Sequence, residues 1–111
     1  MARRDDEALE RIRQELAALV VQGSLPGSLV VRTLRCGRGN CACHADQPKL
    51  HGPYVQWSYS YRAKRVNRWL TAEQADRLRA QVDRGRRIKQ LAAELDAAEI
   101  RRAERAEGWG T

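Results

Sequence analysis

The sequence predicts an α+β fold in which a small antiparallel sheet separates two helices along the chain. Three observations predict it: helical periodicity near the N-terminus, β-favouring segments in the middle, and a long helical segment after them. The chain has 111 residues, the size of one small domain. We expect a single domain whose segments are 1–23, 24–70 and 71–107, with a tail at 108–111.

The first helix is predicted over residues 4–22. Acidic residues near its start suit the positive end of a helix dipole. Gly23 follows the last helical residue and is expected to cap the helix in the left-handed conformation. The apolar residues recur at spacings of three and four, the period of one helix face, at Leu9, Ile12, Leu16 and Leu19.

Three strands are predicted in the middle of the chain, at 28–35, 54–61 and 65–70. They are rich in β-branched and aromatic residues. We assign Trp57 and Trp69 mostly to the core. Because the connection at 62–64 has no glycine, it is a weak turn signal. In the second strand, alternation places Val55, Trp57, Tyr59 and Tyr61 on one face and Tyr54, Gln56, Ser58 and Ser60 on the other.

The second helix is predicted over about 72–105. It begins at a capping-box pattern, in which Thr71 is followed three residues later by Gln74. Gly85 costs about 1 kcal/mol relative to alanine inside a helix. It therefore either kinks one long helix or separates two. We favour one helix, because no proline or turn cluster interrupts the segment.

The positive charge of the protein is concentrated in one part of the chain. The net charge is +7, and residues 26–70 contain eight basic side chains and one acidic one. This local excess favours an acidic partner, with nucleic acid the commonest kind and DNA favoured over RNA; the alternative is a solvated face. Aromatic residues interleave with the basic ones near 57–69. The candidate phosphate contacts are Arg35, Arg38, Arg62, Lys64, Arg65 and Arg68.

All three cysteines lie within eight residues, at Cys36, Cys41 and Cys43. Three thiolates and one imidazole form the ligand set of a closed, tetrahedral zinc site. His51 is the favoured fourth ligand, because His44 is adjacent to Cys43 and would ligate awkwardly. The alternatives are three free thiols or one disulfide.

A catalytic zinc would need an open coordination position and a general base. Asp46 is the one acidic residue in 26–70, and no second catalytic partner accompanies it. We therefore expect no enzymatic activity.

The motif Cys36-Gly37-x-x-x-Cys41-x-Cys43, followed by His51-Gly52-Pro53-Tyr54, resembles that of a small prokaryotic family known as a domain of unknown function. The resemblance covers about residues 24–98. It implies that the cysteines and His51 are the matching positions, and it implies an association with mobile elements. The chain departs from the family pattern at Gly39-Asn40 and at the 62–64 connection, which lacks the usual Asn-Gly-like turn.

Taken together, the sequence predicts a small zinc protein that binds nucleic acid through a basic hairpin at 62–68. The alternative is a protein-interaction module, such as an accessory subunit of a larger DNA-acting complex, that uses its amphipathic helices for a partner or a homodimer. No apolar run resembles a secretory signal or spans a bilayer, so we expect a cytoplasmic protein.

Overall fold

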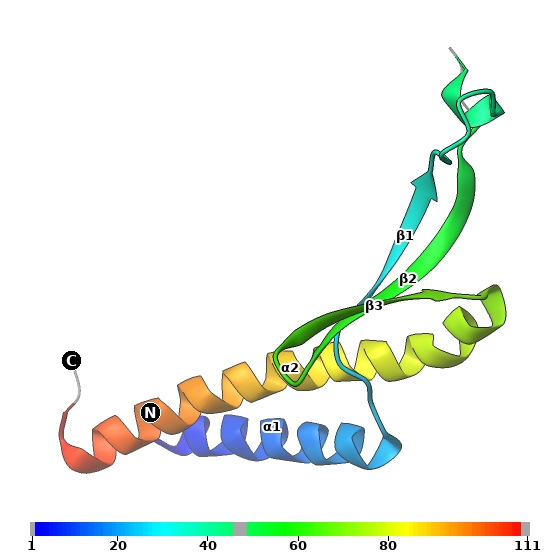
Figure 1. The fold of residues 1–111 in the computed structure, drawn as a ribbon. Helices are drawn as coiled ribbons and strands as arrows, with labels where there is room; N and C mark the ends of the chain where they lie inside the picture. The colour runs from blue at the N-terminus through cyan, green and yellow to red at the C-terminus, as the bar shows by residue number, and fades with distance from the viewer. Residues whose placement is uncertain (1, 46–48, 110–111) are drawn as a thin grey trace. The chain divides into compact units, whose positions relative to one another are not determined.

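The computed structural model describes residues 2–45 and 49–109. Asp46, the candidate general base, lies outside the described residues. The architecture confirms the predicted α+β class: an N-terminal helix, a three-stranded antiparallel sheet and a long C-terminal helix (Figure 1). The elements are α1 (Ala2–Gln22), β1 (Ser28–Leu34), the short 3₁₀ helix η1 (Ala42–His44), β2 (His51–Tyr61), β3 (Lys64–Leu70) and α2 (Ala72–Glu107).

Contacts within the chain divide it into two compact units. The helical unit comprises Met1–Leu25 and Asp83–Thr111, and the sheet unit comprises Pro26–Val82. The continuous helix α2 contributes its first residues to the sheet unit and the remainder to the helical unit. Among the described residues, no helix is both long and apolar enough to cross a membrane.

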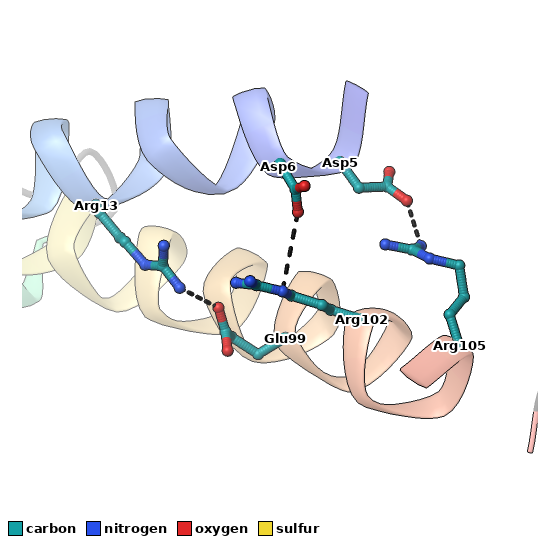
Figure 2. Close-up of polar contacts among 6 residues, drawn as sticks. All are labelled: Asp5, Asp6, Arg13, Glu99, Arg102 and Arg105. Carbon is teal, nitrogen blue, oxygen red and sulfur yellow. Dashed lines mark hydrogen bonds and ion pairs between the residues drawn. The ribbon is translucent and has the colours of Figure 1, made fainter. Parts of the chain in front are cut away.

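In the helical unit, α1 and the second part of α2 share a small apolar core. Leu9 of the predicted stripe is fully buried, as is Leu91. Ion pairs flank this core, and Figure 2 shows three of them. Each joins exposed or half-exposed groups and therefore contributes little to the stability of the unit. The pairs are Asp5–Arg105, Asp6–Arg102 (3.8 Å), Arg13–Glu99 (2.5 Å) and Glu15–Arg87 (2.7 Å).

The order of these pairs shows that the two helices run antiparallel, because the start of α1 meets the end of α2. Arg87 donates two hydrogen bonds to the Glu15 carboxylate, at 2.7 and 3.0 Å. These bonds hold the pKa of Glu15 below its ordinary value.

The segment that follows α1, at residues 23–25, lies against α2 at Gly85. Gly23 has φ of +86°, as expected for a left-handed cap, and its carbonyl accepts a 2.7 Å hydrogen bond from Arg84 Nε. A Cβ built at Gly85 would lie 2.0 Å from the carbonyl oxygen of Leu25. Because α2 is one continuous helix, Gly85 does not separate two helices. It allows the backbone at Leu25 to contact the surface of α2 directly.

The sheet has the order β1-β2-β3, and both pairings are antiparallel. Tyr61 pairs with Lys64, so Arg62 and Ala63 form a two-residue turn. Both have positive φ, 50° and 63°, which is the backbone pattern of a type I′ hairpin. The connection that gave a weak turn signal thus forms a tight turn with a defined register.

Few of the described side chains of the sheet unit are fully buried. Ala75 and Val82 of α2 are, and Ser58 is 5% exposed and donates a 2.6 Å hydrogen bond to Asn67. Half-buried Trp57 donates to the Pro26 carbonyl at 2.9 Å. The assignment of Trp69 to the core was wrong: its side chain is 51% exposed.

The start of α2 has the predicted capping box. The backbone N–H of Gln74 donates to Thr71 Oγ1 at 3.1 Å, and the N–H of Thr71 donates to Gln74 Oε1 at 2.9 Å. This reciprocal pair satisfies two backbone donors at the helix start and fixes the end of β3 to the first turn of α2.

Candidate metal centre

The cysteine loop is closed at its base by the β1–β2 pairing. Leu34, the last residue of β1, pairs with His51, the first residue of β2. Cys36 therefore lies two residues after the end of one strand, while His51 begins the other. Between them, η1 carries Cys43 back toward the loop base. Figure 1 shows this loop at the end of the β1–β2 pair, opposite the β2–β3 turn.

The structure brings four potential ligands together, namely Cys36, Cys41, Cys43 and His51. One ligand atom from each lies within 4.8 Å of all the others. The Sγ atoms of Cys36 and Cys43 are 3.5 Å apart, and Cys41 Sγ is 3.3 Å from His51 Nε2. A disulfide has an S–S distance of about 2.05 Å, so these cysteines are not bridged. Two sulfurs of a tetrahedral zinc site lie about 3.8 Å apart, given Zn–S bonds of about 2.3 Å.

Hydrogen bonds and burial within the loop shift the pKa values of two thiols in opposite directions. The pKa of Cys41 is lowered to about 6, chiefly by the backbone N–H of Cys43 and then by the side chains of Cys36 and His51. Burial raises the pKa of Cys43, whose side chain is fully enclosed. Cys43 Sγ in turn accepts a 3.2 Å hydrogen bond from the N–H of Cys36. Amides directed at sulfur favour the thiolate, which is the form that binds a metal.

The two histidines have different surroundings. His51 is half-buried within the cluster. His44 is exposed, and its Nε2 lies 2.5 Å from the carbonyl oxygen of Cys36, which accepts a hydrogen bond from a ring N–H. His44 thus ties η1 to the end of β1, while His51 lies among the thiols.

The donor set suits a zinc ion. Thiolates and imidazole are preferred by Zn²⁺, and four protein ligands would leave no coordination position for a substrate. The cluster could therefore hold a metal of the structural kind, with Cys43 at its buried side.

A family model covers most of the chain, including this cluster. The model is that of a domain of unknown function, DUF6788, and it matches residues 4–80. The chain belongs to the DUF6788 family. The match begins earlier and ends earlier than the expected resemblance over 24–98. No curated protein and no solved structure matches the chain.

The DUF6788 match also includes the basic hairpin. In the β2–β3 turn, the Arg62 guanidinium lies 5.2 Å from the centre of the Tyr61 ring. Arg68 Nε donates a 2.8 Å hydrogen bond to the hydroxyl of Tyr59. Lys64 is exposed next to the turn. These contacts hold two guanidinium groups against tyrosines without neutralising their charge.

The six candidate phosphate contacts do not form one cluster. Arg62, Lys64, Arg65 and Arg68 lie on the β2–β3 hairpin, whereas Arg35 and Arg38 lie in the cysteine loop. The two groups lie toward opposite ends of β2, whose 11 residues span about 33 Å at about 3.3 Å per residue. Arg68, opposite Trp57, is the hairpin residue nearest the loop. On the hairpin, Lys64 and Arg68 share one face of the sheet and Arg65 lies on the other.

Charge is divided unequally between the two units. The sheet unit carries ten basic and three acidic side chains, a net charge of +7, while the helical unit carries eleven of each. All four ion pairs found among residues 2–45 and 49–109 belong to the helical unit. The basic side chains of the hairpin therefore have no acidic partner in the described part of the chain.

Arg32 of β1 is a further basic residue of the sheet, and it is not among the six candidate phosphate contacts predicted from the sequence. It is exposed, lies opposite Tyr54 in the sheet register, and donates a 3.0 Å hydrogen bond from Nε to Gln56 Oε1. Its place on the sheet follows from the β1–β2 register, which the local sequence does not encode.

Proposed function

We propose that this protein is a small zinc-binding protein without enzymatic activity that binds nucleic acid, DNA in preference to RNA, through its β2–β3 hairpin. The zinc part is supported by one observation above all: the four ligand atoms lie within 4.8 Å of one another. The ion would fix the end of β1 to the start of β2 and so hold the middle strand in place.

The proposal that the protein has no enzymatic activity rests on the proposed coordination of the zinc ion. Three thiolates and His51 would fill the tetrahedral positions of zinc, so no water or substrate could bind the ion. A structural zinc also has no need of a neighbouring general base.

Nucleic-acid binding is supported by the charge of the sheet unit. Its net charge is +7, and in the described residues its basic hairpin takes part in no ion pair. Such a surface attracts a polyanion and gains free energy by releasing counterions from it. Lys64, Arg65 and the turn residue Arg62 are exposed at the end of the hairpin, where a phosphate backbone can reach them.

Zinc content by elemental analysis tests the metal site. We expect one zinc per chain in the wild type, loss of zinc in Cys43→Ser and His51→Ala, and retention in His44→Ala. His44→Ala is the matched control, because that imidazole contacts the Cys36 carbonyl rather than the thiols. Zinc retained in His51→Ala, or absent from the wild type, would contradict the proposed site.

A salt titration of DNA binding tests the nucleic-acid part. The logarithm of the affinity is expected to fall linearly with the logarithm of the salt concentration, with a slope of about −0.9 per phosphate contacted in duplex DNA. The triple variant Arg62→Gln, Lys64→Gln, Arg65→Gln should weaken binding and make this slope shallower. Arg101→Gln removes one exposed charge from the helical unit and serves as control. Binding that is independent of salt would rule out phosphate contacts.

The competing function is protein interaction through the helices. The structure gives it less support, since the predicted apolar stripe of α1 contributes Leu9 to the core that it shares with Leu91 of α2. Sedimentation separates the two functions. A monomer that binds DNA favours the first, whereas a stable dimer with feeble DNA binding favours the second.

A further inference from the structure

Two aromatic rings are exposed side by side on one face of the sheet. Tyr54 of β2 is 43% exposed and Trp69 of β3 is 51% exposed. Their ring centres are 6.0 Å apart with planes at 72°, an edge-to-face arrangement. In such a pair, the ring that offers its edge keeps both of its faces free of its partner. Large aromatic surface is therefore open to solvent next to the cysteine loop.

The rings border a shallow hollow of about 270 Å³, whose other lining residues are Leu34 and Leu70. The hollow is apolar, and it lies on a sheet unit of net charge +7. An apolar surface with exposed aromatic rings accommodates a planar group without needing particular hydrogen-bond partners.

Basic side chains lie on the same face as these rings. The register places Arg32 opposite Tyr54 and Trp69 opposite Gln56. Because Gln56 is two residues after Tyr54 in β2, all four residues lie on the same face of the sheet. Arg65 lies on the same face of β3 as Trp69, because the two are four residues apart in the strand. Both arginines are exposed. We call the surface formed by Arg32, Tyr54, Gln56, Arg65 and Trp69 the aromatic face.

We propose that the aromatic face stacks unpaired bases, so that the nucleic acid bound by this protein is single-stranded. The inference rests on the proposed function and specifies its substrate class. Tyr54 and Trp69 supply ring surfaces for bases, and Arg32 and Arg65 supply charge for the phosphates beside them. Stacking on exposed aromatic residues beside basic groups is how proteins bind single strands without sequence preference.

A duplex cannot use this surface in the same way. Its bases are already stacked on one another and expose only their edges in the grooves. A duplex can still contact the basic hairpin through phosphates, but the exposed rings would contribute nothing to its binding. The preference for single strands thus depends on the rings, while the salt dependence depends on the charges.

Fluorescence anisotropy with a labelled single-stranded DNA and with the duplex of the same sequence tests the proposal. We expect the wild type to bind the single strand at least tenfold more tightly. Trp69→Ala should lose roughly tenfold or more of the single-strand affinity and little of the duplex affinity. Trp69→Phe keeps a ring for stacking and should retain most of the single-strand affinity.

Trp109→Ala is the matched control, because Trp109 is 69% exposed but lies in the helical unit. Its single-strand affinity should equal that of the wild type. Zinc content and thermal unfolding of each variant separate loss of stacking from loss of folding. Equal binding of single strand and duplex, unchanged in Trp69→Ala, would overturn the proposal and leave the proposed function standing. Binding to neither DNA would overturn both.

Discussion

At the β2–β3 turn, two residues with side chains occupy a conformation that glycine adopts more easily. Arg62 and Ala63 have φ of 50° and 63°. For residues with a Cβ, the left-handed region costs about 1–2 kcal/mol because Cβ approaches the carbonyl oxygen. The favourable pairing of β2 with β3 on either side of the turn must offset this cost.

Replacing Ala63 by glycine should therefore stabilise the protein. The relief of strain exceeds the extra freedom that glycine gives the unfolded chain, so we expect a gain of about 0.5–1 kcal/mol in the free energy of unfolding. Urea unfolding of the zinc-loaded protein measures it. Ala80→Gly is the matched control: Ala80 is exposed within α2, where the same change should destabilise by about 1 kcal/mol. Destabilisation in both variants would show that the turn is not strained.

At the scale of elements, α2 contains a glycine, a residue with low helix propensity, at a point of close contact. Gly85 lies within a helix of 36 residues, and the carbonyl oxygen of Leu25 occupies the place of its missing Cβ. The segment that links α1 to β1 can approach α2 closely only because no side chain stands there. Gly85 thus lowers the helix propensity of α2 but permits the contact with Leu25 within the helical unit.

Gly85→Ala tests this contact by the sign of its effect. Helix propensity alone predicts that alanine stabilises by about 1 kcal/mol. Because a Cβ would lie 2.0 Å from the Leu25 carbonyl oxygen, we expect destabilisation by about 1–3 kcal/mol instead, the usual cost of overpacking. Thermal unfolding measures the difference. A rise in Tm would show that the segment at Leu25 moves away at little cost.

The same elements show which features could be predicted from the sequence. Helix periodicity and the capping box at Thr71 are local signals, and the structure confirms both. The start of β2 was expected at Tyr54, yet the strand begins at His51, because its pairing with Leu34 across the loop is non-local. Pro53 is tolerated inside β2 where the register shifts opposite the residues between Arg32 and Leu34.

The candidate ligands could be predicted as a set because cysteines so close in sequence are also close in space. The adjacency of His44 to Cys43 favours His51 as the fourth ligand, and the structure places His51 at the cluster. The exposure of Trp69 could not be predicted, because it depends on which face of the sheet remains uncovered. The excess of basic residues in 26–70 can be counted in the sequence. Its confinement to one of two structural units cannot be predicted from the sequence, because the division into units depends on the fold.

At the scale of the whole molecule, the two units are stabilised in different ways. The helical unit combines a core of apolar side chains with four ion pairs among its described residues. In the sheet unit, Cys43 is among the largest fully buried side chains. A unit with so few buried apolar groups gains much from a metal, because zinc affinity for such ligands becomes folding free energy.

Removal of zinc should therefore affect the two units unequally. With a chelator, we expect amide hydrogen exchange to quicken in β1 and β2, whose pairing the cysteine loop closes, and to change little in α1. Exchange followed by mass spectrometry of peptides from 28–34, 51–61 and 2–22 measures this. Cys43→Ser should already exchange quickly in β1 and β2 without chelator, and the chelator should have no further effect on it. If α1 loses protection as fully as β1 and β2, the helical unit depends on the metal too, and the separate sources of stability proposed here are wrong.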